Sequence, residues 1–334
     1  MPKAEGPADI DDRDVDRHQK ILEDVYAAEC ARDFDRAEAV LSTAIRQQTS
    51  AGHVAHYLGE LALITLAQGR YDQALELVQN LRSGSPDLIH GFPLLHRNLE
   101  ACREIAAFLR SGEMIAEVPF RGHKLNFLVS GQNSEIEHFH VRGLLYETEE
   151  VDLILRFLRD GDTLLDIGAN VGNHAIACAA AVPGARIHAF EPVQKCCEFL
   201  RQNVALNSLT NIEISGLGSA IGPEDGEVRI LERINLASSK STENEIGTLV
   251  PMRALRGLWP ERVDFIKIDV EGLEVSILES VIDLVHRDNT RVLLECYKAT
   301  VEADLEELAF LGLTPLAQVE RQAVVNVLVA PKSD

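Results

Sequence analysis

The stretch Leu164-Leu165-Asp166-Ile167-Gly168-Ala169-Asn170-Val171-Gly172-Asn173-His174 decides the fold of this chain. Its apolar beginning predicts a short buried strand, which ends close to the carboxylate of Asp166. The glycines at 168 and 172 predict a tight turn whose backbone can approach a ligand, because no Cβ stands in the way. A helical pattern follows directly, so the stretch predicts a strand–turn–helix unit of a parallel α/β sheet.

Short β-branched runs alternate with helical patterns along this part of the chain. The runs that predict strands are His123–Val129, Phe139–Val141, Thr163–Ile167, Arg186–Phe190, Ile212–Ser215, Glu227–Leu231, Asp264–Asp269, Arg291–Glu295 and Val324–Val329. The helical patterns are Asn173–Ala181, Gln194–Asn207, Leu273–His286 and Val301–Leu311. This alternation predicts an α/β fold, a mostly parallel sheet with helices on both faces. Because ligands of such sheets bind beyond the carboxyl ends of the strands, we expect the chemistry in the loops that follow.

The chain before residue 116 has a different character. Residues 1–16 are polar and acidic and predict a disordered lead-in, whereas residues 17–115 predict a helical domain. Asp33-Phe34-Asp35-Arg36-Ala37 resembles Arg70-Tyr71-Asp72-Gln73-Ala74, as in a degenerate pair of tetratricopeptide-type hairpins. A plain helical bundle explains the same pattern equally well. The α/β domain is then expected to span residues 116–334.

The composition is that of an ordinary globular protein, with 46% hydrophobic and 25% charged residues. The formal net charge of −21 argues against a general affinity for nucleic acid or anionic membranes, which needs clustered Lys and Arg. No apolar run approaches the roughly 20 residues that span a bilayer, and the N-terminus lacks an apolar signal core. We therefore expect a cytoplasmic protein without a membrane span. The six cysteines form no C-x-x-C pair and are expected to be reduced thiols.

The carboxylate of Asp166 indicates which ligand the turn binds. The glycine spacing is Gly-x-x-x-Gly, not the G-x-G-x-x-G of dinucleotide sites. An anion near a helix N-terminus would repel a pyrophosphate but attract a ligand that carries an ammonium group. S-adenosylmethionine has such a group and no phosphate, so the turn favours this cofactor over NAD.

Two later segments add further acids at the ends of strands. Glu191 ends the second strand, where it can accept hydrogen bonds from both ribose hydroxyls, as does the acid about 20 residues after a nucleotide-binding turn. In Asp264–Glu274, strand alternation puts Lys267 and Asp269 on one side, with Asp269 at the strand end over the site. We expect Lys267 to pair with a neighbouring acid. Glu274 begins the next helix, where a carboxylate suits the helix dipole.

Together these motifs resemble the FkbM family of S-adenosylmethionine-dependent O-methyltransferases. The family's Asp-Ile-Gly-Ala-Asn-x-Gly turn is found at Asp166–Gly172, its Phe-Glu-Pro acid at Phe190–Pro192 and its Lys-Ile-Asp-x-Glu-Gly-x-Glu block at Lys267–Glu274. The resemblance covers roughly residues 120–331. It implies a class I methyltransferase fold, with a Rossmann-like seven-stranded sheet whose last strand is reversed. It also implies methyl transfer to a hydroxyl, often of a sugar, glycan or natural product.

The resemblance further implies roles for individual residues. The turn that contains Asp166 would surround the methionine part of the cofactor, Glu191 would hold its ribose, and Ser219–Ala220 would lie along its adenine. Tyr146 and Glu147 would close the site from the N-terminal side. The full set of implied cofactor-binding residues is Tyr146, Glu147, Asp166, Gly168, Asn170, Gly172, Glu191, Ser219, Ala220 and Asp269.

Methyl transfer to an alcohol also removes a proton, which calls for a base or a metal. The candidate catalytic acids are Asp269, Glu271 and Glu295. Three acids that converge on one pocket could instead hold Mg²⁺ through oxygen ligands. His138 and His140 are also candidates for a base near neutral pH, but the pattern is better explained by two surface histidines on a strand.

Two other functions are compatible with the sequence. One is an NAD-dependent oxidoreductase on the same general fold, against which the missing G-x-G-x-x-G argues. The other is a catalytically inert protein whose helical domain binds a partner, against which the acids at 166, 191 and 269 argue. The helical domain is a candidate for partner binding, substrate presentation or self-association. The polar stretch Asn235–Thr242 is either a mobile substrate loop or an ordinary solvated one.

Overall fold

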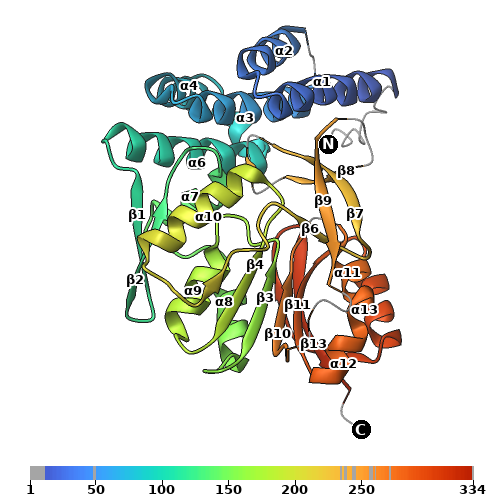
Figure 1. Ribbon diagram of the computed structural model, residues 1–334. Coiled ribbons are helices and arrows are strands. Elements are labelled where there is room, and N and C mark those ends of the chain that lie inside the picture. The colour runs from blue at the N-terminus through green and yellow to red at the C-terminus, as the bar shows by residue number, and fades with distance from the viewer. Residues whose placement is uncertain are drawn as a thin grey trace, which may run out of the picture.

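A computed structural model describes residues 12–47, 50–233, 235–236, 239–242, 246–255, 259, 261–270 and 272–332. Residues 1–11, most of the predicted lead-in, lie outside this part, and the first helix already begins at Asp12. The chain forms a helical part followed by an α/β part, which Figure 1 shows stacked one above the other. A hairpin of β1 (Ile115–Phe120) and β2 (His123–Leu128) follows directly after the helical part.

The N-terminal part is helical, as the sequence predicts. Its elements are α1 (Asp12–Cys30), α2 (Phe34–Gln47), α3 (Ala51–Ala67), α4 (Tyr71–Gly84), α5 (Pro86–Gly91) and α6 (Pro93–Arg110). The two matched segments begin equivalent helices, because α2 starts at Phe34 and α4 at Tyr71, and their alanines Ala37 and Ala74 are fully buried. Small side chains at these positions let neighbouring helices approach closely. The likeness to tetratricopeptide hairpins stays a prediction.

The α/β part is built on a seven-stranded sheet with the order β12-β13-β11-β10-β3-β4-β5. The strands are β3 (Thr163–Ile167), β4 (Arg186–Phe190), β5 (Ile212–Glu213), β10 (Phe265–Ile268), β11 (Arg291–Tyr297), β12 (Leu313–Glu320) and β13 (Val324–Pro331). Neighbours pair in parallel except at β13, which is antiparallel to both β11 and β12. This order with a reversed last strand is the class I methyltransferase topology, so the predicted fold class is confirmed.

Two predicted strands lie outside the main sheet, and one of them, His123–Val129, forms β2 of the hairpin. The run Glu227–Leu231 forms β7 (Gly226–Leu231), which belongs to a separate sheet with β6 (Ala220–Gly222), β8 (Lys240–Thr242) and β9 (Thr248–Ala254). The seventh strand of the main sheet is instead β12, which the sequence pattern did not indicate. β12 is an edge strand with mostly exposed side chains and a register shift after Pro315, so it lacks the apolar run of a buried strand.

Helices cover both faces of the main sheet, as expected. On one face lie α8 (Thr148–Phe157), α9 (Asn173–Ala181) and α10 (Gln194–Leu206), and on the other α11 (Glu274–Ser280), α12 (Ile282–Asp288) and α13 (Val301–Phe310). Each face of the sheet packs against its helices in a separate hydrophobic core. Successive strand residues point to the two cores in turn, so Leu164 lies in the first core and Leu165 in the second. Where one helix was predicted over 273–286, the structure has two, α11 and α12, which are separated by Val281.

The predicted strand at Phe139–Val141 is wrong, because this segment belongs to the end of α7 (Ser134–His140). The carboxylate of Glu137 accepts hydrogen bonds from the backbone N–H groups of Ser130 and Gly131, at 2.9 and 2.7 Å, which fixes the loop that leads into the helix. A run of three residues is too short to distinguish a strand from a helical turn.

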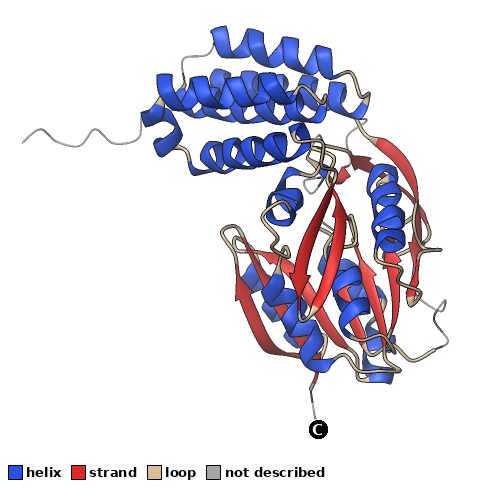
Figure 2. Cartoon of the chain, turned by 90° about the vertical axis from the view of Figure 1, so that its left-hand side faces the viewer, coloured by secondary structure: helices blue, strands red, loops and turns tan. Residues whose placement is uncertain are grey.

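The helical part lies across the end of the sheet where the parallel strands finish (Figures 1 and 2). A buried ion cluster joins the two parts. Arg233, which follows β7, donates hydrogen bonds to Glu29 of α1 and Glu60 of α3, both at 2.8 Å. Its guanidinium also lies 3.7 Å from the centre of the Tyr26 ring. These contacts therefore hold the loop after β7, which belongs to the α/β part, against helices α1 and α3.

Candidate active site

A cavity of about 770 Å³ opens at the carboxyl ends of β3, β4 and β10. Its floor includes the turn at Gly168–Asn170, its sides include Glu191 and Asp269, and its upper wall includes residues of α6 and α7. A volume of this size suits a nucleoside-sized ligand together with a second molecule. The position agrees with the expectation that ligands of such sheets bind beyond the carboxyl ends of the strands.

The turn after β3 needs glycine at position 168. Gly168 has a φ of +80°, and a Cβ at this residue would lie 1.8 Å from the carbonyl oxygen of Asp269. The backbone N–H groups of Gly168 and Ala169 donate to the carbonyl oxygen of Phe190, at 3.0 and 2.9 Å. The loops after β3, β4 and β10 are therefore packed backbone against backbone, and only a residue without a side chain fits between them.

Glu191 is held rigidly at the side of the cavity. Its carboxylate accepts hydrogen bonds from the backbone N–H groups of Asn170 and Val193, both at 2.8 Å. The side chain is buried, and this burial raises the pKa of Glu191 to about 7. Each carboxylate oxygen keeps a further lone pair, so Glu191 can still accept hydrogen bonds from two neighbouring hydroxyls.

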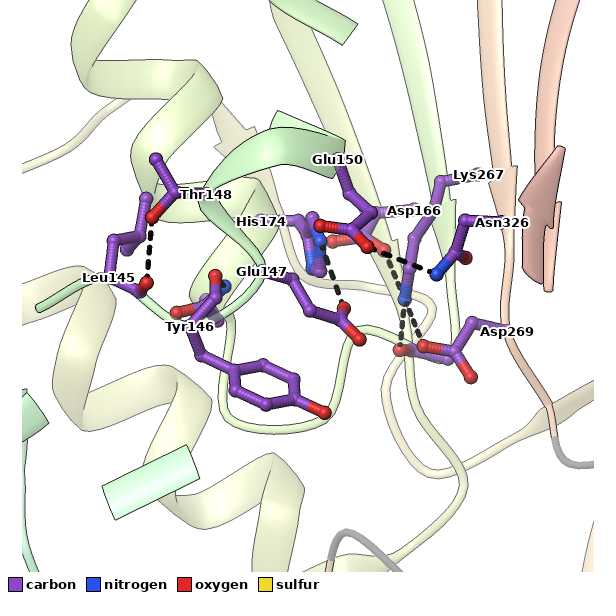
Figure 3. Close-up of polar contacts among 12 residues, drawn as sticks. Leu145, Tyr146, Glu147, Thr148, Glu150, Asp166, His174, Lys267, Asp269 and Asn326 are labelled. Atoms are coloured by element: carbon purple, nitrogen blue, oxygen red, sulfur yellow. Dashed lines mark hydrogen bonds and ion pairs between the residues drawn. The ribbon is translucent and has the colours of Figure 1, made fainter. Parts of the chain in front are cut away.

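A buried lysine lies between two acids beside this turn (Figure 3). The Lys267 ammonium is 3.1 Å from Asp269 Oδ2 and 3.5 Å from Asp166 Oδ1, and it donates to the carbonyl oxygen of Gly168 at 2.9 Å. Burial opposes the charged lysine, but these acids outweigh it and raise the pKa of Lys267. The predicted pairing of Lys267 with a neighbouring acid is therefore confirmed.

Asp166 lies deeper than the sequence suggested. Its side chain is fully buried, and neither carboxylate oxygen has a hydrogen-bond partner among the described residues. Burial raises the pKa of Asp166, while Lys267 acts in the opposite direction. Asp166 does not line the cavity, so Lys267 and Asp269 stand between it and a ligand.

A second pair of side chains reaches the cavity from α8 and α9. Glu147 Oε2 lies 3.4 Å from His174 Nε2, and both side chains are almost completely buried. Figure 3 shows the Glu147 carboxylate directed toward the ends of Lys267 and Asp269. Burial, with the positive charge of Lys267, holds the pKa of His174 well below its usual value, so its imidazole is neutral.

Residues 166–312 match the family described as the Methyltransferase FkbM domain. The chain contains an FkbM methyltransferase domain. It is 28% identical over 189 residues to Methyltransferase sdnD of Sordaria araneosa, which covers 44% of this chain and 73% of that protein. It is also 28% identical over 198 residues to Hexuronic acid methyltransferase AglP of Haloferax volcanii, which covers 58% of this chain and 79% of that protein. The protein is thus an S-adenosylmethionine-dependent methyltransferase.

Solved structures with some likeness to this methyltransferase include Methyltransferase FkbM from Methylobacillus flagellatus KT. That match has 15% sequence identity and a TM-score of 0.40, and it covers 70% of this chain and 54% of the other. M. jannaschii TYW2 in complex with AdoMet matches with 12% identity and a TM-score of 0.36, over 65% of this chain and 85% of the other.

The cavity of the methyltransferase fits its cofactor on three counts. Gly168 has no side chain, so the backbone of the turn can lie directly against the backbone of the loop after β10. Glu191 offers free lone pairs at the place where a ribose would lie in such a fold. Several acids line the cavity, among them Glu191, Asp269 and Glu295, which suits a cation and disfavours a pyrophosphate.

The structure brings most of the predicted site residues together. Those that line the cavity are Tyr146, Glu147, Gly168, Asn170, Glu191, Ala220, Asp269 and Glu295. Three others lie behind the lining, namely Asp166, Gly172 and Ser219. Glu271 lies outside the described residues, so its predicted catalytic role stays a prediction.

Neither of the two candidate histidines at 138 and 140 is a surface residue on a strand. His138 Nε2 lies 2.9 Å from Glu104 Oε2 at the cavity wall, and burial lowers the pKa of His138. The His140 ring is buried, stacks on Phe127 with 4.0 Å between ring centres, and contacts Asn173 Oδ1 at 3.1 Å. Burial lowers the pKa of His140 to about 4, so this side chain is a neutral part of the core.

The magnesium prediction gains no support from the residues that the structure describes. Among them, no group of three His, Cys, Asp or Glu side chains is arranged to hold a metal ion. Asp269 is instead paired with Lys267, whose ammonium occupies the position that a cation would take beside this carboxylate. The described helices also include none long and apolar enough to cross a bilayer.

Two parts of the site escaped sequence analysis. His174 stands two residues after Gly172 in the quoted motif, where its position on the inward face of α9 could have been noticed. The second part is a wall contributed by the helical part, which consists of Leu94, Arg97, Asn98 and Ala101 of α6. No sequence pattern predicts this wall, because its position depends on how the helical part packs against the α/β part.

Proposed function

We propose that this methyltransferase transfers the methyl group of S-adenosylmethionine to a hydroxyl of a sugar, glycan or other natural product. The observation that supports the proposal best is a set of hydrogen-bonding side chains within the largely apolar lining of the cavity, beyond the cofactor residues. They come from α6, α7, the loop after β7 and β8, namely Asn98, Glu135, Asn235 and Ser241. Such a lining suits a molecule with several hydroxyls. The name of one relative, a hexuronic acid methyltransferase, agrees with a sugar as substrate.

The predicted cofactor residues keep their proposed roles, except for Asp166 and Glu147. Glu191 would accept hydrogen bonds from the ribose, and Ala220 would lie along the adenine, with Ser219 behind it. The turn at Gly168 and Asn170 would bound the methionine part. Asp166 would act through Lys267, because its own carboxylate does not reach the cavity.

The reaction requires little covalent chemistry from the protein. When bound, the cofactor supplies an activated methyl group on a sulfonium. The protein's own residues align the acceptor hydroxyl with it, exclude water and take up one proton. The rigid turn at Gly168 and the doubly held carboxylate of Glu191 supply the alignment, since both are fixed by backbone hydrogen bonds. Of the proposed proton acceptors, Asp269 and Glu295 line the cavity.

The cofactor site is tested by the pH dependence of binding. Only the ionised carboxylate of Glu191 accepts two hydrogen bonds, and its pKa is raised to about 7. We therefore expect the affinity for S-adenosylhomocysteine, measured by calorimetry, to rise between about pH 6 and pH 8 and then level off. Glu191→Gln should weaken binding by about 10–100-fold and remove this dependence. Glu198→Gln on α10, whose partly exposed side chain pairs with Lys195, serves as control. A Glu191→Gln protein that binds like wild type contradicts the assignment.

The substrate class is tested by the product. The protein is incubated with methyl-labelled S-adenosylmethionine and the small-molecule and glycan fractions of a cell extract, and labelled products are identified by mass spectrometry. We expect a methyl ether on a hydroxylated molecule. A methylated amine, carboxylate or thiol as the main product would refute O-methylation while leaving the cofactor site intact.

A further inference from the structure

Glu147 stands out among the carboxylates of the cavity because of its backbone and its burial. It precedes α8 in a left-handed conformation with a φ of +50°, which few residues other than glycine adopt. Its side chain is only 10% exposed, yet it lines the cavity. A strained residue that carries a buried acid into a ligand cavity points to a chemical role for that acid.

The neighbours of Glu147 come from every element packed around it. His174 on α9 approaches one carboxylate oxygen to 3.4 Å, and its Nε2 has no hydrogen-bond partner among the described residues. Lys267 and Asp269 face it from β10, Glu150 from α8 and Arg321 from the end of β12. The side chain of the adjacent Tyr146 favours the ionised form of the Glu147 carboxyl.

Other carboxylates of this region are paired with cations. Asp269 lies 3.1 Å from the Lys267 ammonium, and Glu149 lies 3.3 Å from the Arg321 guanidinium. Glu150 is bound by Arg321 and by the side-chain amide of Asn326. The partner of Glu147 is instead the neutral imidazole of His174. Among the described residues Glu147 forms no ion pair with Lys or Arg, and a carboxylate outside an ion pair binds a proton more readily than one within it.

We propose that Glu147 accepts the proton of the acceptor hydroxyl during methyl transfer, with His174 positioning its carboxylate. This inference rests on the proposed O-methylation and assigns its base to a residue other than Asp269, Glu271 and Glu295. The acceptor oxygen forms a bond to the methyl carbon, and the carbon–sulfur bond breaks with its electron pair passing to sulfur. The hydroxyl proton passes to the Glu147 carboxylate, and from there to solvent after product release.

The charge balance of the cavity suits this role. Burial, together with Asp269 and Glu150, raises the pKa of Glu147 to about 8, so it holds a proton near neutral pH before ligands bind. S-adenosylmethionine carries one more positive charge than S-adenosylhomocysteine. A positive charge in the same cavity favours the ionised form of Glu147, which is the form that can accept a proton. Once the methyl group has moved, that charge is gone, and the protonated form is favoured again.

The first experiment measures proton release on binding and needs no acceptor. Calorimetry of wild-type protein at about pH 7, in buffers of different ionisation enthalpy, counts the protons released by each of the two ligands. We expect S-adenosylmethionine to release more, by up to about one proton per protein. Contacts to ribose and adenine are common to both ligands, so the difference isolates the sulfonium charge. Glu147→Gln should abolish the difference and change the affinity for S-adenosylhomocysteine by less than about threefold.

The controls separate a proton-binding role from a structural or cofactor-binding one. Asp152→Asn changes an exposed carboxylate on the same helix, which pairs with Arg121 at 2.8 Å, and should behave like wild type. The proposal is overturned if Glu147→Gln keeps the difference in proton release. It is equally overturned if this variant loses more than about tenfold in affinity for S-adenosylhomocysteine, because Glu147 would then hold the cofactor.

The second experiment follows turnover of methyl-labelled S-adenosylmethionine with the small-molecule and glycan fractions as acceptor. We expect the wild-type rate to fall at low pH, and Glu147→Gln should lower the rate by about 10²–10⁴ and remove this fall. His174→Gln should shift the midpoint of that pH profile without changing the affinity for S-adenosylhomocysteine, which a merely structural residue would not do. Unchanged rates and profiles overturn the proposal. Failure of O-methylation shows separately, as a labelled product that carries its methyl group on another atom.

Discussion

At the scale of single residues, the site depends on a few positions that tolerate no other side chain. Gly168 is the clearest, because its φ of +80° and the carbonyl oxygen of Asp269 both exclude a Cβ. Glu191 is another, because it joins two loops through their backbone N–H groups. Its pKa of about 7 also affects stability. Because the folded protein binds this proton more tightly than the unfolded chain, Glu191 stabilises the fold at a pH below the carboxyl pKa of the unfolded chain. This stabilisation is lost as the pH rises through about 7.

Gly168→Ala tests the close approach of the loops. We expect this change to lower the free energy of unfolding by more than about 2 kcal/mol and to abolish binding of S-adenosylhomocysteine. Gly161→Ala is a matched control, since Gly161 has a similar φ of +91° but open space around the position of a Cβ. It should cost about 1–2 kcal/mol and leave binding intact. Equal effects of both substitutions in denaturant titrations would refute the packing argument.

At the scale of elements, helix α10 links the hairpin of β1 and β2 to the turn after β3. The buried side chain of Asn203 accepts a hydrogen bond from the Leu128 N–H at 2.8 Å and donates one to the Val171 carbonyl at 2.9 Å. Asn207, one turn later, bonds to both backbone groups of Asn126. The edge of β2 is thereby paired with side chains, because no further strand is available on that side.

Asn203→Ala should leave a partly buried N–H of β2 and a buried carbonyl of the turn without their side-chain partner. We expect a loss of about 2–4 kcal/mol in the free energy of unfolding, measured by urea denaturation. The adjacent Gln202→Ala is the control, since Gln202 is exposed and contacts only the carbonyl of Glu198 within its own helix, at 3.3 Å. A loss below about 1 kcal/mol for Asn203→Ala would mean that water replaces the side chain.

At the scale of the whole molecule, the helical part completes the cavity. Its helix α6 contributes a wall, and the cluster of Arg233 with Glu29 and Glu60 anchors the loop that leads to Asn235 and Leu236. Leu236 is buried and packs beside Ile230. The proposed division into a helical and a catalytic domain thus places the boundary near β1, while the site itself draws on both sides of it.

Arg233→Ala tests this anchoring. The change leaves the buried carboxylates of Glu29 and Glu60 without their shared cation, so we expect a loss of about 3–5 kcal/mol in the free energy of unfolding. Arg201→Ala, at an exposed position on α10, should cost less than about 0.5 kcal/mol. If denaturation gives similar values for the two variants, the cluster does not hold the parts together.

The sequence by itself determined most strands of the main sheet and the turn after β3, because both rest on local signals. Apolar runs marked the buried strands, and the turn from Asp166 to Gly172 and the acids at Glu191 and Asp269 needed only their places at strand ends. Only the tertiary structure decided that Asp166 is hidden behind Lys267 and that β12 completes the sheet. It also decided that Glu147 meets His174 and that α6 closes the cavity. These contacts join residues far apart in the chain, and burial, which sets their proton affinities, is a property of the packed molecule.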